Sequence, residues 1–287
     1  FKCIDCGPRF SNQFGPILKN NLPEFTNFND LIHLKLLGGE PFLEKRNFEL
    51  LKNVPRKNIN LMLVTNNSIF PNTELLNLLL DFKHVDLNIS IDGIGDLHDE
   101  LRGVKGAYTQ AINAIGLLAK EKFIQELQIT TVISKKNIHL LEEMYKEFSK
   151  LGIDSWRMIN VDPIGRAEIN KELLLSGKEL KVLLDFIKEK RKNQKKIKVL
   201  YGCSGFLGTE YEGEVRDRYF ICNTGINTAS ILYNGDIYVC PNVPRRKEWI
   251  QGNIRSDSFV DVWNNKFQLF RDENRTWCEK CSKCEWG

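Results

Sequence analysis

The sequence predicts an α/β protein whose larger first part contains parallel strands and whose last part is a small cysteine-rich domain. Short strand-like segments alternate with amphipathic segments through the first part of the chain. The cysteines lie toward the two ends, with none between Cys6 and Cys203. Strands that alternate with helices favour parallel pairing through right-handed crossovers, so a partial barrel of β-α units is expected.

The strand pattern occurs five times, and the first four segments end in glycine or a polar residue. These segments are residues 32–38, 60–66, 86–92, 127–134 and 155–161. Helical periodicity is found between them, at residues 43–53, 73–82, 107–121 and 138–150. The motifs GGEP, TNN, SIDG and TVISKKN therefore fall at the carboxyl ends of strands, which is where barrel enzymes build their active sites.

Three regions are expected along the chain. Residues 1–165 would form the barrel, residues 166–200 a helical linker, and residues 201–287 a domain rich in cysteine, glycine and tryptophan. A sixth strand is expected before Phe1 if the first cysteine pair lies in a loop after it. Both ends of the chain are thus expected to be incomplete.

The composition limits the function classes. The 287 residues are 42% hydrophobic and 27% charged, which suits one large domain and one smaller domain and excludes a disordered chain. The net charge of +4 is weak support for nucleic-acid binding. A membrane span needs about 18 consecutive apolar residues, and no such run is present, so no membrane span is expected.

The eight cysteines indicate metal or redox chemistry. Disulfide scaffolds are typical of short secreted chains, whereas close Cys-x-x-Cys pairs in a large globular sequence favour metals. Taken alone, Cys3 and Cys6 fit a zinc knuckle, a redox pair or part of an iron-sulfur cluster equally well. A four-iron cluster with one open iron needs a third thiolate, which must either lie upstream of Phe1 or be absent.

The GGEP motif, residues 38–41, is a second candidate site. Two glycines let the backbone approach a ligand, Glu40 can accept a hydrogen bond from an ammonium group, and Pro41 stiffens the turn that follows. A tight turn that begins a helix explains an isolated GGEP equally well.

Together these motifs resemble the radical S-adenosylmethionine superfamily, whose members carry Cys-x-x-x-Cys-x-x-Cys, then GGEP, then a Ser-x-Asp-Gly strand. The resemblance covers most of residues 1–166 and implies a (β/α)6 TIM-like partial barrel. Cys3 and Cys6 would be catalytic ligands of a 4Fe-4S cluster. The cofactor-binding residues implied for S-adenosylmethionine are Gly38, Gly39, Glu40 and Pro41 at the ammonium, Thr65, Asn66, Ser90 and Asp92 toward the ribose, and Arg102 or Ser134 at the carboxylate.

Each of these assignments has a structural alternative. Residues 65–67 and 92–93 are also good turn sequences, and Arg102 could form a surface ion pair. The PIGRA segment, residues 163–167, resembles the same superfamily where it carries a cysteine-rich extension, although alone it indicates only a turn.

The C-terminal part resembles the SPASM extension, which houses auxiliary 4Fe-4S clusters. A hairpin turn at Asn234 and Gly235 is expected to present Cys240. The resemblance implies that Cys222 and Cys240 bind one auxiliary cluster and that Cys281 and Cys284 bind a second. Cys278 stays unassigned, Cys203 is either a further ligand or a buried free thiol, and structural zinc is the rival interpretation.

The resemblance implies a cytoplasmic enzyme that cleaves S-adenosylmethionine reductively and modifies a peptide or protein, with flavodoxin or ferredoxin as electron donor. Two alternatives stay open at this point. One is a sulfatase-type maturase or a radical enzyme of small-molecule cofactor biosynthesis. The other is a non-catalytic binding module that holds zinc or no metal.

Overall fold

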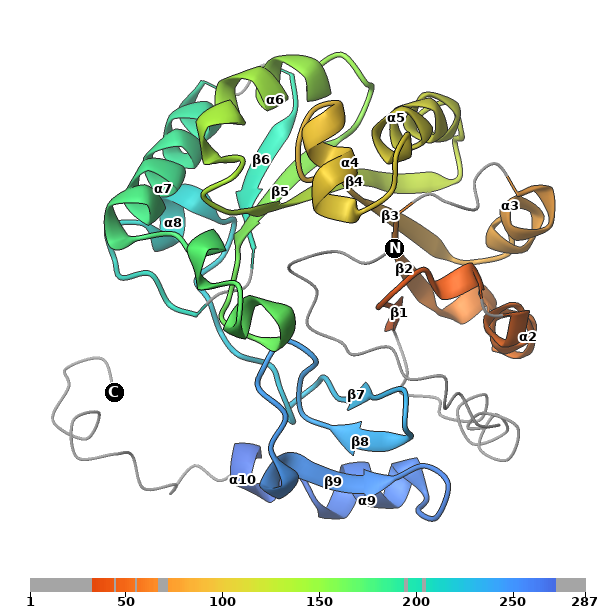
Figure 1. The fold of residues 1–287 in the computed structure, drawn as a ribbon. Coiled ribbons are helices and arrows are strands. Elements are labelled where there is room, and N and C mark those ends of the chain that lie inside the picture. The colour runs from red at the N-terminus through yellow and green to blue at the C-terminus, as the bar shows by residue number, and fades with distance from the viewer. Residues whose placement is uncertain are drawn as a thin grey trace, which may run out of the picture. The chain divides into compact units, whose positions relative to one another are not determined.

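The structure, a computed structural model, describes residues 33–43, 45–54, 56–66, 72–193, 196–202 and 205–271. These residues form two compact units, one ending at Ile221 and the other beginning at Cys222. Each unit is described separately below. Figure 1 shows both, with the described residues drawn as ribbon.

The first unit contains a six-stranded sheet in which all neighbouring strands are parallel. The strand order β1-β2-β3-β4-β5-β6 repeats the order along the chain. The predicted α/β class with parallel strands is therefore confirmed. The strands are β1 (His33–Leu36), β2 (Asn60–Thr65), β3 (His84–Ser90), β4 (Ile124–Ile133), β5 (Ser155–Asn160) and β6 (Lys198–Tyr201).

Helices connect these strands in a regular βα alternation (Figure 1). The predicted helical segments correspond to α2, α3, α5 and α6, each within a few residues of its expected bounds, whereas α4 and the short α8 were not predicted. The helices are α2 (Lys45–Asn53), α3 (Thr73–Leu79), α4 (Asp96–Arg102), α5 (Ala107–Leu118), α6 (Leu141–Phe148), α7 (Gly177–Lys192) and α8 (Glu212–Val215), with 3-10 turns η1 (Pro41–Leu43), η2 (Arg56–Asn58), η3 (Ile138–Leu140), η4 (Gly165–Glu168) and η5 (Lys171–Leu173).

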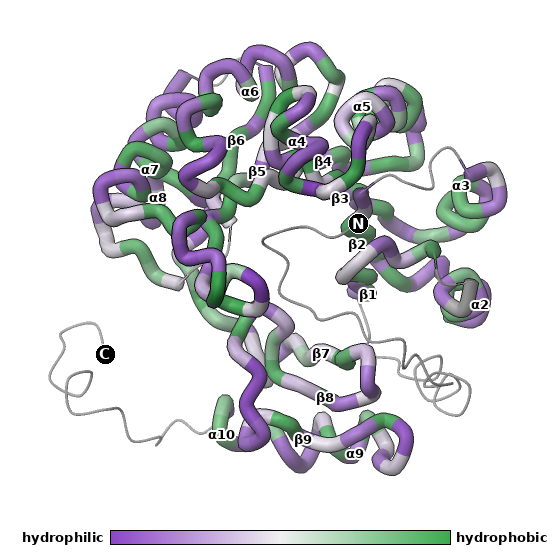
Figure 2. Tube along the Cα trace, viewed as in Figure 1, coloured by the Kyte–Doolittle hydropathy of each residue, from purple (hydrophilic) through white to green (hydrophobic). Residues whose placement is uncertain are grey.

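The two faces of the sheet differ in polarity. On β3, Val85, Leu87 and Ile89 are buried, and they alternate with polar residues on the opposite face. The apolar face packs against helices, and Trp156 of β5 lies edge-on to Phe148 of α6, with ring centroids 5.2 Å apart. The helices in turn alternate hydrophobic and hydrophilic positions along the chain (Figure 2). Burial of this apolar face holds the strands in register.

Residues 166–200 differ from the expected linker. They form η4, η5, α7 and most of β6, and β6 pairs with β5. Phe186 of α7 also packs against the Trp156 ring, at 6.0 Å between centroids. This segment therefore extends the first unit, because its strand and helix bury their apolar residues against β5. The sixth described strand follows β5, whereas the sequence placed a sixth strand before Phe1, outside the described residues.

The second unit is a small three-stranded sheet with two helices. Its strands β7 (Ser230–Ile231), β8 (Asp236–Tyr238) and β9 (Ile250–Asn253) pair antiparallel, and α9 (Phe259–Asn265) and α10 (Gln268–Arg271) follow, with a 3-10 turn η6 (Lys247–Trp249) before β9. The core is built from Ile237, Tyr238, Ile254, Val262 and Phe267. Gly235 has φ +89° between β7 and β8, which confirms the predicted hairpin turn at Asn234 and Gly235.

Candidate functional site

The GGEP loop begins directly after β1. Gly38 and Gly39 have φ values of +85° and +40°, a backbone region that favours glycine. Pro41 then opens η1, where Pro41 and Phe42 are both buried. A Cβ added at Gly38 would meet no atom within 4 Å, so its backbone conformation, and not a lack of space, calls for glycine. This turn carries the chain into the buried position of Glu40, which is 8% exposed.

The two oxygens of the Glu40 carboxylate have different surroundings. Oε2 accepts hydrogen bonds from the Thr65 hydroxyl at 2.5 Å and from the Asn66 backbone N–H at 3.0 Å. Oε1 is buried and has no hydrogen-bond partner. Burial raises the pKa of the Glu40 carboxyl, and the Thr65 hydroxyl and the backbone N–H groups of Asn66 and Phe42 oppose that shift. The result is a buried carboxylate, fixed on one side, that can still accept a hydrogen bond from a cationic donor.

This arrangement brings together three residues that the sequence assigned to S-adenosylmethionine. Thr65 ends β2 and Asn66 follows it, so both lie at the same sheet edge as the GGEP loop. The sequence placed Thr65 and Asn66 toward the ribose. In the structure each donates a hydrogen bond to Glu40, which fixes the carboxylate in place.

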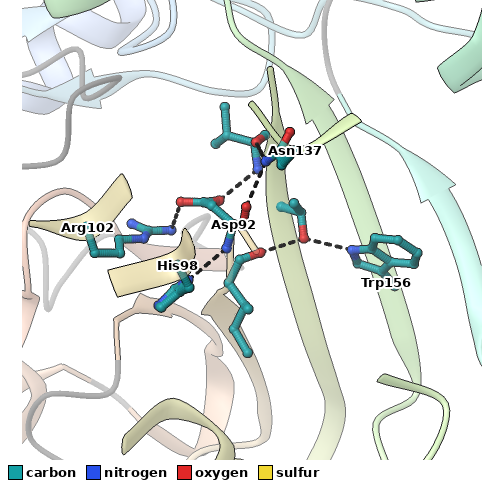
Figure 3. Close-up of polar contacts among 8 residues, drawn as sticks. Asp92, His98, Arg102, Asn137 and Trp156 are labelled. Atoms are coloured by element: carbon teal, nitrogen blue, oxygen red, sulfur yellow. Dashed lines mark hydrogen bonds and ion pairs between the residues drawn. The ribbon is translucent and has the colours of Figure 1, made fainter. Parts of the chain in front are cut away.

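A second polar cluster surrounds Asp92, just after β3 (Figure 3). Asp92 is 1% exposed. Its Oδ1 accepts a hydrogen bond from the Val132 N–H at 2.9 Å, and its Oδ2 lies 2.6 Å from a guanidinium nitrogen of Arg102. The Arg102 side chain is 12% exposed. The ion pair that the sequence left open for Arg102 is thus present, but it is buried and connects α4 to the end of β3.

His98 of α4 contacts the same residue. Its Nδ1 accepts a hydrogen bond from the backbone N–H of Asp92 at 2.9 Å (Figure 3). Burial, assisted by the positive charge of Arg102, lowers the pKa of His98 to about 3. The imidazole is therefore neutral at pH 7, as its acceptor role requires. Sequence reasoning missed His98, and its only signal was a histidine six residues after Asp92.

Asn137 connects β3 with β4 at this edge. Its Nδ2 donates to the carbonyl oxygens of Asp92 and Val132 at 2.7 and 2.8 Å, and its Oδ1 accepts from the Ser134 N–H at 2.8 Å. It is 0% exposed, so these bonds satisfy polar groups that water does not reach. Sequence reasoning missed Asn137 as well.

Two further predicted residues lie at the same edge. Ser134 is 3% exposed, and its Oγ accepts a hydrogen bond from the Lys136 N–H at 3.2 Å. Ser90 ends β3, is half-buried and stands opposite Thr130 of β4. The described residues assigned to S-adenosylmethionine thus lie at the carboxyl ends of β1 to β4, the part of a parallel sheet where ligand sites form, except Arg102, which ends α4 and reaches this edge through its ion pair with Asp92.

The thiols are described only in part. Cys222 is exposed and Cys240, two residues after β8, is half-buried, and both are free. The backbone N–H of Asn242 lies 3.5 Å from the Cys240 sulfur. The described residues contain no group of three potential metal ligands. The remaining predicted thiols, Cys3, Cys6, Cys203, Cys278, Cys281 and Cys284, lie outside the described residues.

Comparison of the sequence with known proteins gives matches along most of the chain. Residues 222–285 match the SPASM family, an iron-sulfur cluster-binding domain. The AdoMet-dependent heme synthase of Methanosarcina barkeri is 26% identical, over 88% of this chain and 74% of its own length. The mycofactocin maturase MftC of Mycolicibacterium smegmatis is 27% identical, over 84% of this chain and 60% of its own length.

Solved structures show the same fold. SuiB of Streptococcus suis bound to S-adenosylmethionine has a TM-score of 0.70 at 18% identity, covering 99% of this chain and 68% of SuiB. SuiB bound to its precursor peptide SuiA has a TM-score of 0.70 at 17% identity, covering 99% and 66%. These structures confirm the predicted partial barrel followed by a small domain. By its motifs and its C-terminal match, the chain is similar to radical S-adenosylmethionine enzymes that carry a SPASM iron-sulfur domain.

Proposed function

We propose that this chain cleaves S-adenosylmethionine reductively to a 5'-deoxyadenosyl radical, which then removes a hydrogen atom from a peptide or protein substrate. The observation that carries the proposal is the Glu40 carboxylate. Its Oε1 is buried without a hydrogen-bond partner, while Oε2 is held by Thr65 and Asn66. A primary ammonium group is a donor that satisfies such an oxygen.

The residues of the GGEP loop fit the methionine end of S-adenosylmethionine. Glu40 would hold the ammonium, and Gly38 and Gly39 would let the backbone approach the ligand, because glycine, which the positive φ values favour, has no side chain. Thr65 and Asn66 would keep the carboxylate oriented. Ser90, Arg102 and Ser134 stay candidates for the ribose and carboxylate, and the buried pair of Asp92 with Arg102 supports a positioning role for Asp92.

Thiolates would hold the iron-sulfur clusters, since cysteine thiolates are their usual protein ligands. We propose Cys3 and Cys6 for the cluster that works with S-adenosylmethionine. Cys222 and Cys240 are proposed for one auxiliary cluster, with Cys281 and Cys284 on a second. The match to the iron-sulfur family begins at residue 222, where the second compact unit also begins, and this supports a domain boundary between Ile221 and Cys222.

Peptide modification is the proposed substrate class because a fold relative, SuiB, has been solved with a precursor peptide and a sequence relative is a maturase. Flavodoxin or ferredoxin is proposed as the electron donor. Among the described residues, every helix is too short or too polar to span a bilayer. A cytoplasmic location is proposed because thiolate ligands persist in a reducing compartment.

The test is anaerobic reconstitution of the full-length protein with iron and sulfide, followed by reduction in the presence of S-adenosylmethionine. We expect 5'-deoxyadenosine from the wild type and none from Cys3→Ala/Cys6→Ala, which serves as the matched control. Mass spectrometry of candidate peptides then reports the modification. A protein loaded with iron and sulfide that forms no 5'-deoxyadenosine would contradict the proposal, and zinc without iron would favour a non-catalytic module.

A further inference from the structure

Arg166 lies in the PIGRA segment, just after β5, and its backbone is firmly held. It sits in η4 after Gly165, which has φ +65°. The carbonyl oxygen of Arg166 accepts hydrogen bonds from the N–H groups of Ile169 and Asn170 at 3.3 and 3.2 Å. The next residue, Ala167, is 0% exposed and packs in a small apolar cluster. The guanidinium is therefore carried by a structured turn at the carboxyl end of a strand.

No hydrogen-bond or ion-pair partner of the guanidinium group is found among the described residues. Its Nε and Nη2 atoms are buried and without a hydrogen bond, and no carboxylate of the described residues lies within 4.0 Å of it. Asp162, the acid on the same loop, instead accepts a hydrogen bond from Asn160 at 3.1 Å. Other described arginines with a buried guanidinium nitrogen each hold a partner, namely Arg56 with Asp81, Arg102 with Asp92, Arg216 with Glu212, Arg271 with the Gly225 carbonyl, and Arg157.

Arg166 as a whole is half-buried, but two of its guanidinium donors are buried and unpaired, which is unfavourable unless an acceptor binds them. Arginine presents two parallel N–H donors on one edge, which match the two oxygens of a carboxylate. Arg166 therefore has the charge and the donor geometry for a carboxylate at the edge of the sheet where Glu40 also lies.

The position in the sheet indicates which molecule brings that carboxylate. Glu40 follows β1 and Arg166 follows β5, four places along the strand order. Neighbouring strands lie about 4.8 Å apart, so the two strand ends are about 19 Å apart along the curved sheet. The ammonium and carboxylate of methionine are attached to the same carbon, so they cannot reach Glu40 and Arg166 at once over such a distance. A second molecule must therefore bring the carboxylate to Arg166. Resting on the proposed function, we propose that Arg166 binds a carboxylate group of the peptide substrate.

Two capped tripeptides serve as probes, acetyl-Gly-Glu-Gly-amide and acetyl-Gly-Gln-Gly-amide, with binding measured by equilibrium dialysis. The protein is the full chain, cluster-loaded and saturated with S-adenosylmethionine. We expect the wild type to bind the glutamate peptide about tenfold more tightly, as a charged hydrogen-bonded pair should. Arg166→Gln should lose this preference. Arg218→Gln, which removes an arginine at an exposed position, is the control and should keep it.

Equal binding of both peptides by the wild type, or a preference that survives Arg166→Gln, would overturn the proposal. If Arg166→Gln does not fold, Arg166→Lys replaces it: the charge is kept and the paired donors are lost, so a reduced preference supports the proposal and an unchanged one overturns it.

A second experiment compares the binding of S-adenosylmethionine with that of its decarboxylated form. If Arg166→Gln weakens only the former, the carboxylate belongs to S-adenosylmethionine and the substrate assignment is overturned. If the protein forms no 5'-deoxyadenosine but still prefers the glutamate peptide, the proposed function is contradicted and the carboxylate site at Arg166 is not.

Discussion

Asp92 and Arg102 form an ion pair that is almost closed to solvent, with 2.6 Å between Oδ2 and a guanidinium nitrogen. The pair joins the end of β3 to the last turn of α4. Asp92 also accepts a hydrogen bond from Val132 of β4, so one carboxylate links three elements. The shape of this edge of the sheet therefore depends on a charged residue that is satisfied within the protein.

Replacing Asp92 with Asn should destabilise the fold. Asn can still accept the hydrogen bond from Val132, but Arg102 would lose its counter-charge while staying buried. Breaking a buried ion pair in this way costs about 3 kcal/mol or more in free energy of unfolding. Denaturant unfolding measures the loss. Glu147→Gln, which breaks the exposed pair with Lys150, is the control and should change stability by less than about 1 kcal/mol. Equal effects of the two variants would refute the prediction.

Replacing Glu40 with Gln should weaken S-adenosylmethionine binding and leave the fold intact. The amide oxygen can keep the hydrogen bonds from Thr65 and Asn66, but the negative charge is lost. A charged hydrogen bond contributes about 1.5–3 kcal/mol, so the dissociation constant should rise about tenfold to a hundredfold. Equilibrium dialysis of the cluster-loaded protein measures it. Glu121→Gln, at an exposed position, should bind as the wild type does. An unchanged dissociation constant in Glu40→Gln would show that the Glu40 carboxylate does not bind S-adenosylmethionine.

His98 should make stability fall in mild acid. Its pKa is lowered to about 3 in the folded protein, while an unfolded histidine titrates near 6.5. Below about pH 6.5 the unfolded chain therefore binds a proton at His98 that the native state does not bind. The free energy of unfolding should fall as the pH drops below this value. The slope reaches about 1.4 kcal/mol per pH unit and ends near pH 3.

The measurement is urea unfolding at pH 7 and at pH 5 for the wild type and for His98→Asn. The Asn side chain places an acceptor near the Nδ1 position but has no titratable group. The variant should lose about 2 kcal/mol less than the wild type between these pH values. Identical losses in the two proteins would show that His98 does not cause the effect.

Replacing Cys240 with Ser should remove an auxiliary cluster and leave the unit folded. Cys240 is a free, half-buried thiol that follows the buried core residues Tyr238 and Val239. We expect iron and sulfide to fall by about one four-iron cluster per chain, since serine is a poor substitute for thiolate. Cys203→Ser is the comparison, and it should keep the wild-type iron content if Cys203 is the buried free thiol that the sequence allows there. Wild-type iron content in Cys240→Ser would contradict the ligand assignment.

The strands were predictable because each has a run of apolar residues ended by polar residues, as residues 86–92 show for β3. The strand at Lys198–Tyr201 was not, since it has four residues and follows a strongly basic stretch. His98 and Asn137 were missed for another reason. Both bind backbone groups of Asp92, and no sequence pattern records which backbone groups a side chain meets. Arg102 and Asp92 are ten residues apart and are separated by a turn. The sequence therefore allowed an ion pair of Arg102 as an alternative to a role in binding the cofactor, but did not identify Asp92 as the partner.

The order of strands in the sheet has a consequence for how the protein is made. In the six-stranded sheet, each strand from β2 to β6 pairs with the one synthesised just before it, so contacts within this sheet stay close along the chain. A growing polypeptide can then add one strand at a time to an edge that already exists, with little delay for distant partners. Ribosome-bound chains halted after β4 should already protect β2 and β3 from protease, and uniform digestion of such chains would argue against stepwise assembly.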